Sequence, residues 1–317
     1  MRVLITGAGG FIGSGLVELL RARGRVGEAP VSTLALADRR LAQDVPAGAL
    51  RFEGDLGSAA VLQRIADFRP ELVFHLAAVP GGAAESDYAL GRRMNLDATL
   101  EMFELLADSD RPPSVVYASS IAVYGTSLPE VVRPDTPLRP PLTYGAHKLA
   151  CEILLADFSR RGLLDGRSVR LPGIVARPRE PSGLASAFMS DLLHALRVGE
   201  RFTCPVSPQA TSWWMSAPCC AENLLLAAAM DVSRADPARA WPLPVLHLSI
   251  AQVIETCATL YGDDRRQLVT FEPNAKLEAV FGSYPPLDDS ASRDLGLHDD
   301  GSPDNLVRRA LGARDTL

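Results

Sequence analysis

Tyr144 and Lys148 are the residues whose types and spacing first suggest chemistry, because they stand four positions apart in the chain. On a helix this spacing places the phenol and the ammonium on one face, about one turn apart. A cation held there favours the phenolate and lowers the pKa of the phenol, so Tyr144 could take a proton from an alcohol near neutral pH. The same pair occurs by chance on exposed helices, and its meaning depends on the motifs around it.

Two serines precede this pair. Residues 114–118 are largely apolar and are predicted to form a strand that delivers Ser119 and Ser120 to the carboxyl edge of a sheet. Open α/β sheets bind their ligands at that edge, and a hydroxyl there can hydrogen-bond and orient a reacting oxygen. The alternative is that the two serines only terminate the strand.

A glycine-rich turn stands at the start of the chain, between a short apolar strand over residues 1–6 and an amphipathic helix. Gly7, Gly10 and Gly13 permit the tight turn, the close approach of a pyrophosphate, and close helix–strand packing. The start of the helix then offers N–H groups and its positive dipole end to the phosphates. A strand before and a helix after the glycines predict a dinucleotide site.

The second predicted strand, residues 32–37, runs into Asp38, which stands roughly twenty residues beyond the glycines. A carboxylate at this position can accept hydrogen bonds from both ribose hydroxyls of NAD and repels the 2′-phosphate of NADP. NAD is therefore predicted in preference to NADP. Arg39 and Arg40 follow directly, and either could accommodate that phosphate; the alternative is a solvated turn.

Two more segments are predicted to reach the same edge of the sheet. Residues 52–56 end a third strand, so that Asp55 and Leu56 could border the adenine. Residues 72–78 form a near-continuous apolar stretch, as expected for a strand buried on both faces. His75 within it is predicted to be a hydrogen-bonded core side chain, because no second metal-binding residue lies at a suitable spacing. No metal site is predicted.

The order of these elements predicts an α/β fold with a doubly wound parallel sheet, the Rossmann arrangement, and helices on both faces. A stretch rich in proline and glycine, beginning at Pro172, marks the crossing into a second, smaller α/β lobe. The predicted division is an NAD-binding domain over residues 1–172, to which the chain returns around 212–232. Residues 173–317 are then mainly a substrate-binding lobe.

Composition limits the function classes. With 317 residues, 47% of them hydrophobic and 22% charged, the chain can bury a sizeable core. A net charge of −6 gives no basic field to attract nucleic acid. No segment approaches the length of a membrane span, and the first strand leaves no room for a signal peptide. Five cysteines without a C-x-x-C pair fit reduced thiols, so a cytoplasmic location is expected.

Taken in order, these motifs resemble the extended short-chain dehydrogenase/reductase superfamily, and the second half of the chain narrows the resemblance to the D-erythronate dehydrogenase family. The first-half motifs are jointly very specific: Gly7/Gly10/Gly13, Asp38, residues 75–78, Asn95, residues 117–125 and residues 144–148. The second-half signature is less specific and comprises residues 157–162, 165–167, 170–172, 177–178, 212–218, 284–285 and 295–297.

The resemblance implies NAD-dependent oxidation of D-erythronate to 2-oxo-D-erythronate. It implies that Tyr144 is the base, that Lys148 holds the phenolate and the nicotinamide ribose, and that Ser120 bonds the reacting oxygen. It also implies a homodimer built on the helix of Tyr144 and the helix before it. The implied cofactor contacts are Gly7, Gly10, Phe11, Ile12, Gly13, Asp38, Asp55, Leu56, Leu76, Ala77, Ala78, Asn95, Ser119, Tyr144, Lys148, Leu171 and Pro172.

The substrate contacts are less well defined. A small hydroxy acid needs a cation or N–H donors for its carboxylate. Arg177 and Arg179 lie in the stretch that lines the substrate pocket in related enzymes, and either could serve; a surface salt bridge is the alternative for both. Trp213 and Trp214 could wall the pocket, although one of them is expected to be core packing.

Two other functions use the same motifs. A nucleotide-sugar 4-epimerase would share the Ser/Tyr/Lys site and recycle its reduced cofactor, but residues 212–214 replace a segment that nucleotide-sugar pockets commonly use. A non-catalytic NAD(P)-binding regulatory protein would not need Tyr144 and Lys148, and both are present. Oxidation of a small sugar acid is therefore the favoured prediction.

Overall fold

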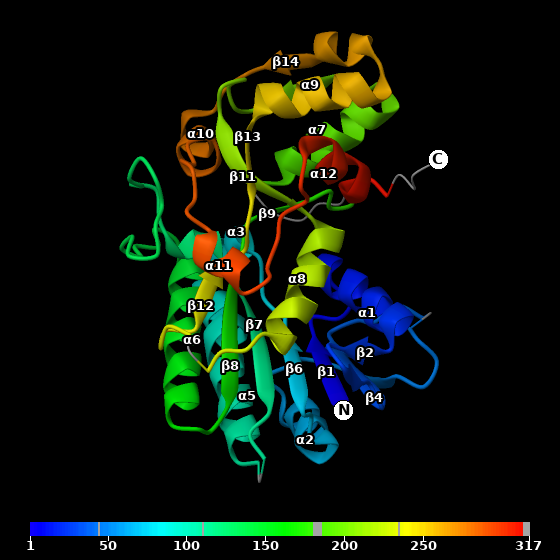
Figure 1. The fold of residues 1–317 in the computed structure, drawn as a ribbon, viewed down its shortest axis with the longest axis vertical. Helices are drawn as coiled ribbons and strands as arrows, with labels where there is room; N and C mark the ends of the chain where they lie inside the picture. Colours follow the sequence, from blue (N-terminus) through cyan, green and yellow to red (C-terminus); the bar gives the residue numbers. More distant parts are fainter. Residues whose placement is uncertain (44, 110, 180–185, 234, 313–317) are drawn as a thin grey trace.

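The structure is a computed structural model that describes residues 1–43, 45–109, 111–179, 186–233 and 235–312. Its main feature is a seven-stranded sheet in the order β12-β8-β7-β6-β1-β4-β5, with every neighbouring pair parallel. From β1 the chain winds outward first to one edge and then to the other (Figure 1). The prediction of a doubly wound parallel sheet is confirmed. The strands are β1 (Arg2–Thr6), β4 (Thr33–Asp38), β5 (Leu50–Glu53), β6 (Leu72–His75), β7 (Ser114–Ser120), β8 (Asp165–Leu171) and β12 (Ala240–Pro242).

Helices cover both faces of this sheet. On one face α1 (Phe11–Arg23) and α8 (Ala217–Ala229) bury a core with one set of alternating strand residues. On the other face α2 (Ala59–Phe68), α5 (Ala98–Ala107) and α6 (Thr143–Arg160) bury a core with the other set. The central strands are apolar on both sides, because side chains alternate along a strand and both faces are covered.

A smaller lobe lies beyond the carboxyl edge of the sheet (Figure 1). It holds the sheet β13-β11-β9 and the pair β10-β14, packed around a separate apolar core. None of the helices in the described ranges is both long and apolar enough to cross a membrane. The elements of this lobe are β9 (Gly173–Val175), α7 (Ala187–Val198), β10 (Phe202–Cys204), β11 (Thr211–Ser216), β13 (Leu246–Ser249), α9 (Ile250–Tyr261), η3 (Asp263–Gln267), β14 (Val269–Phe271), α10 (Ala275–Phe281) and α12 (Pro303–Ala310).

The chain crosses between the lobes several times. Strand β11 pairs within the smaller sheet and runs directly into α8, which covers the large sheet. Ser216 caps that helix, and the buried carboxylate of Asp300 accepts hydrogen bonds from its amide (2.8 Å) and its hydroxyl (2.6 Å). The remaining short elements are β2 (Arg25–Val26), β3 (Ala29–Pro30), α3 (Gly81–Ser86), α4 (Tyr88–Arg92), η1 (Arg93–Asp97), η2 (Ile121–Val123) and α11 (Ser290–Asp294).

Candidate active site

The turn between β1 and α1 has no room for a Cβ at several of its glycines. A Cβ on Gly13 would lie 2.0 Å from the carbonyl oxygen of Gly7. Gly7 itself has a φ of +71°, and a Cβ there would lie 2.6 Å from the amide nitrogen of Ala77. Gly10 occupies the N-cap of α1 and has no side chain to occupy the N–H donors of the first turn, which suits an anion.

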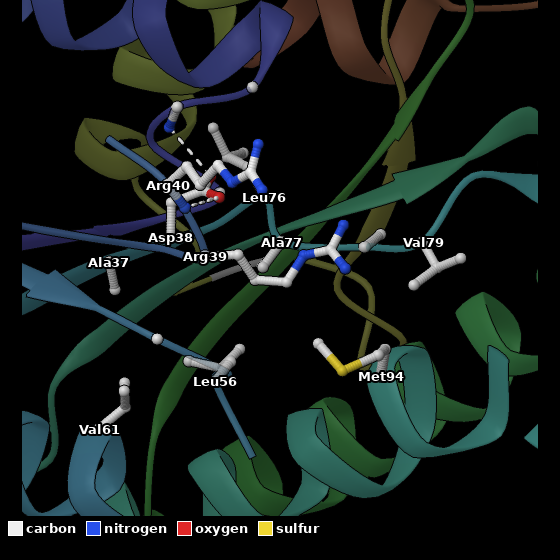
Figure 2. A pocket seen from close by; sticks show the side chains of 15 residues that line it. Ala37, Asp38, Arg39, Arg40, Leu56, Val61, Leu76, Ala77, Val79 and Met94 are labelled. Atoms are coloured by element: carbon white, nitrogen blue, oxygen red, sulfur yellow. Dashed lines mark hydrogen bonds between the residues drawn. The ribbon is translucent and has the colours of Figure 1, made fainter. Parts of the chain in front are cut away.

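A cavity of about 750 Å³ opens beside this turn. Its size is within the range of small-molecule sites. Asp38 lies in its wall and accepts a hydrogen bond from the amide of Gly9 (3.0 Å), as Figure 2 shows. The residues present therefore fit a dinucleotide: a bare turn for phosphates, and a carboxylate for ribose. The predicted cofactor residues that line the cavity are Gly7, Gly10, Asp38, Leu56, Leu76, Ala77 and Ala78.

Sequence reasoning missed several parts of the cavity wall. Gly9 is one of these lining residues, and a Cβ there would lie 2.4 Å from the carbonyl oxygen of Arg40. The two adjacent glycines at 9 and 10 could have indicated this role from the sequence. Arg39 and Arg40, which the sequence offers either as partners of a 2′-phosphate or as a solvated turn, line the cavity, and Arg39 extends across it in Figure 2. The remaining lining residues are Ala37, Gly54, Val61, Val79 and Met94.

Asn95 and Asp55 lie behind this wall. The buried Asn95 amide accepts a hydrogen bond from the amide of Val79 (2.7 Å) and donates one to its carbonyl (3.0 Å). Asn95 thereby fixes the loop after β6. Asp55 forms an ion pair with Arg93, which holds the pKa of the Asp55 carboxyl below its usual value. Neither residue is among those that line the cavity.

His75 is a hydrogen-bonded core side chain, as predicted. Its Nδ1 lies 2.6 Å from the hydroxyl of Thr6, and its Nε2 lies 2.9 Å from the hydroxyl of Thr99. Burial, with the nearby charge of Lys148, lowers the pKa of His75 to about 3. The ring is therefore neutral at physiological pH and joins β1, β6 and α5.

Tyr144 and Ser120 meet at the carboxyl end of β7. Ser120 ends that strand, and its hydroxyl accepts a hydrogen bond from the amide of Ala122 (3.1 Å). Burial raises the pKa of Tyr144 to about 12, although a hydrogen bond with the Ser120 side chain and the charge of Arg177 act in the opposite direction. The expected lowering of this pKa is not found, because burial of the phenolate outweighs the opposing effects of Ser120 and Arg177.

The Lys148 ammonium lies near the rings of Tyr117 and Tyr144. Its ammonium donates a hydrogen bond to the carbonyl of Ala118 (2.7 Å) and lies 4.6 Å from the centre of the Tyr117 ring. The centre of the Tyr144 ring is 5.7 Å away. Burial lowers the pKa of Lys148 to about 8, with Cys151 and Glu152 opposing the shift. The lysine remains mostly protonated at neutral pH, in contact with the ring faces of both tyrosines.

A buried ionic network supports this end of the site. Glu152 pairs with Arg170 through an Oε2–Nη2 contact of 2.7 Å, and both side chains are more than nine-tenths buried. Ser119, a predicted cofactor contact, is 2% exposed, donates a hydrogen bond to Glu152 and is not among the residues that line the cavity. Arg170 also donates to the hydroxyl of Tyr124 (3.2 Å). Sequence reasoning missed Glu152, although its position one helical turn after Lys148 was a signal.

The predicted substrate residues do not lie together. The Arg177 guanidinium lies 4.8 Å from the centre of the Phe11 ring and is the arginine whose charge acts on Tyr144. Arg179 instead forms an exposed ion pair with Glu200 (2.6 Å). Trp214 is fully buried in the core of the smaller lobe, where its indole donates to the carbonyl of Leu248 (3.1 Å), so it presents no surface to a ligand.

The remaining predicted cofactor residues frame the site from two sides. Phe11 and Ile12 are half-buried at the start of α1. Leu171 and Pro172 are buried where β8 ends, at the crossing into the smaller lobe. The described residues thus bring the glycine turn, the serine strand, the tyrosine helix and Arg177 to one edge of the sheet.

Comparison with known proteins agrees with this geometry. The model of the NAD dependent epimerase/dehydratase family matches residues 3–214. D-erythronate dehydrogenase from Cupriavidus necator is 37% identical over 314 residues, which cover 97% of this chain and 97% of that protein. D-erythronate dehydrogenase from Haemophilus influenzae is 30% identical over 317 residues, covering 98% and 99%.

A solved structure is similar over its full length. A nucleoside-diphosphate-sugar epimerase from Agrobacterium tumefaciens superposes with a TM-score of 0.92 and 31% identity, covering 99% of this chain and 94% of that one. Together with the two dehydrogenases, these matches confirm the predicted resemblance and the prediction of an NAD-dependent oxidoreductase. The chain belongs to the NAD dependent epimerase/dehydratase family.

Proposed function

We propose that this enzyme oxidises a small sugar acid, D-erythronate first among them, at a secondary alcohol to give the 2-oxo acid. The observation that carries this proposal is the group of side chains around Tyr144: Ser120 ends β7 beside it, and the Arg177 guanidinium lies near enough for its charge to favour the phenolate. A hydroxyl donor, a proton acceptor and a cation are the groups that a hydroxy acid requires. The two dehydrogenase relatives are named for the same substrate.

Each residue has a distinct task in this reaction. Ser120 would bond the alcohol oxygen and orient it towards Tyr144, whose Oη takes the alcohol proton. Lys148, on the face of the Tyr144 ring, would stabilise the negative charge that the phenolate carries. Bound NAD would supply the hydride acceptor and a positive ring that favours the phenolate. The alcohol loses one proton and one hydride, so it becomes a ketone.

Arg177 is the better candidate for the substrate carboxylate. Arg179 already has a carboxylate partner in Glu200, whereas no described carboxylate lies within 4.0 Å of the Arg177 guanidinium. Burial lowers the pKa of Arg177, with Tyr144 opposing the shift, but arginine keeps its charge at neutral pH. A guanidinium poorly exposed to water binds a carboxylate more strongly than an exposed one.

NAD is proposed ahead of NADP because of Asp38. Its carboxylate borders the cavity at the end of β4, where it repels a 2′-phosphate. Arg39 and Arg40 border the same cavity and reduce that repulsion. Titration calorimetry should give a dissociation constant about tenfold lower for NAD, which corresponds to about 1.4 kcal/mol. Equal constants for the two cofactors would remove the preference.

A homodimer built on α5 and α6 is proposed from the family resemblance and one surface feature. Ile153 on α6 is a large apolar side chain that is 63% exposed, and a second copy of α6 would cover it. Sedimentation should show a dimer for the wild type and monomers for Ile153→Lys. A wild-type monomer at micromolar concentration would contradict this assembly.

The substrate proposal is tested by following reduced cofactor. The protein is offered D-erythronate, the other four-carbon aldonates and a set of nucleotide sugars, each with NAD and with NADP. Net NADH formation from D-erythronate is the expected result. Conversion of a nucleotide sugar to its epimer without net NADH would instead identify an epimerase, the activity for which the Agrobacterium tumefaciens protein is named.

A further inference from the structure

The backbone of Arg177 is held from both sides by one helix of the smaller lobe. Its amide donates a hydrogen bond to the hydroxyl of Ser190 (2.9 Å), and its carbonyl lies 2.8 Å from Nε2 of His194. Ser190 and His194 stand four residues apart and therefore on one face of α7, one turn from each other. Ser190 is 4% exposed. Both backbone polar groups of a single residue are thus satisfied by side chains from outside its own segment.

This contact requires α7 to lie close to β9. Gly173 begins that strand, and a Cβ on it would lie 2.8 Å from the Cε of Met189 and 2.8 Å from the carbonyl oxygen of Trp213. Met189, the neighbour of Ser190, occupies the space that a larger residue at 173 would take. The absence of a side chain at Gly173 therefore sets how closely α7 approaches the segment that carries Arg177.

We propose that Ser190 and His194 are positioning residues that hold Arg177 for the substrate carboxylate, so that α7 of the smaller lobe determines selectivity for acids. This inference rests on the proposed function. With its amide and carbonyl fixed, Arg177 moves only through its side chain, and the Phe11 ring 4.8 Å from its guanidinium restricts that motion further. An anchor that is already in place loses less entropy when the substrate binds.

The contacts of Ser190 and His194 with the backbone of Arg177 can be tested without substrate. In Ser190→Ala the Arg177 amide loses its acceptor, and hydrogen exchange in a peptide spanning residues 173–179 should become at least about tenfold faster. Ser292→Ala is the matched control, because Ser292 is equally buried and bonds the carbonyl of Pro242 (2.6 Å) elsewhere. Unchanged exchange at residues 173–179 in Ser190→Ala would overturn the inference.

The consequence for selectivity is tested by kinetics and by calorimetry. Ser190→Ala and His194→Leu should each raise KM for the hydroxy acid about fivefold to tenfold, with kcat and the dissociation constant of NAD within about twofold. His194→Gln keeps an N–H donor and should restore most of the loss. His247→Leu is the control, since the His247 ring bonds the carbonyl of Tyr284 (2.7 Å) in the same lobe.

The outcomes separate this inference from the proposed function. If Arg177→Gln raises KM for the acid but the α7 variants do not, only the role of α7 fails. If Arg177→Gln binds the acid as tightly as the wild type in calorimetry, the carboxylate anchor of the proposed function fails. If the α7 variants weaken the binding of NAD and of the acid by similar factors, Arg177 contributes to cofactor binding and the selectivity inference is overturned. If His194→Leu alone lowers the melting temperature, its KM is not used. The KM of His194→Gln and the hydrogen exchange of Ser190→Ala then decide the inference.

Discussion

The glycine turn and the tyrosine end of the site present different kinds of atoms to a ligand. At the turn the surface is backbone, kept bare because a Cβ on Gly13 would overlap the carbonyl of Gly7. At the tyrosine end the surface is made of side chains, with the buried Glu152–Arg170 pair behind them. The turn should therefore be sensitive to added volume, and the tyrosine end to lost charge or a lost hydroxyl.

The largest effect is expected for Tyr144→Phe. Removal of the hydroxyl that accepts the proton should lower kcat about 10²- to 10⁴-fold, while NAD binding, which depends on the turn, stays within about twofold. Steady-state kinetics and calorimetry measure the two quantities. Tyr88→Phe, at a tyrosine that is 60% exposed, is the control and should behave as wild type. Full activity in Tyr144→Phe would remove the proposed base.

Glu152→Gln should have the next largest effect, on stability. It leaves the Arg170 guanidinium buried without a charged partner, which should lower the free energy of unfolding by about 3–5 kcal/mol. Urea titration measures this. Glu18→Gln removes a partner of Arg21 where both side chains are 58% exposed, and should change the free energy by less than about 1 kcal/mol. Equal losses in the two variants would show that burial does not distinguish the Glu152–Arg170 pair from the Glu18–Arg21 pair.

Gly13→Ala tests the glycine turn. The new methyl group would overlap backbone, so the turn must shift and the dissociation constant of NAD should rise on the order of 10- to 100-fold. Gly15→Ala is the matched control on the same helix, because a Cβ there meets nothing within 4 Å. It should leave NAD binding unchanged and stabilise α1 by up to about 1 kcal/mol. Normal NAD binding by Gly13→Ala would show that the turn yields at little cost.

The smallest expected effect is the contribution of Lys148 to the pH dependence of the free energy of unfolding. Burial lowers its pKa from 10.5 to about 8, so the unfolded chain binds more protons than the folded one between those values. Stability should therefore gain a contribution from this group as pH rises from about 8 to 10.5, on the order of 1–3 kcal/mol. Lys148→Met should lack this rise and be more stable than wild type at pH 7. Parallel stability curves for the two proteins would contradict the shift.

The glycine turn and the sheet could be predicted from sequence because their requirements are local. Three glycines between an apolar strand and an amphipathic helix need no distant partner to be recognised, and Asp38 follows from the end of the next strand. The hydrogen-bonded state of His75 was also predictable, since an isolated histidine in an apolar strand has no ligand partner nearby.

The partners behind the tyrosine end could not be predicted in the same way. Glu152 and Arg170 belong to a helix and a strand, and no spacing rule joins them. Arg177 could not be separated from Arg179, because the difference lies in Glu200 and in α7. Trp214 was expected at the pocket. It belongs to β11, the central strand between β9 and β13, and its side chain is completely buried. The pKa of Tyr144 depends on burial, which spacing alone does not reveal.

The repeated crossings of the chain have a consequence for how such enzymes diversify. Strand β11 of one lobe continues into α8 of the other, and Ser292 of α11 bonds the carbonyl of Pro242 at the edge of the large sheet. Neither lobe is a single continuous segment of the chain, so exchanging residues 173–317 between homologues would also replace α8, the helix against which α1 packs. A foreign α8 would then have to fit the α1 surface of this chain, whereas a single substitution near Arg177 leaves that contact unchanged.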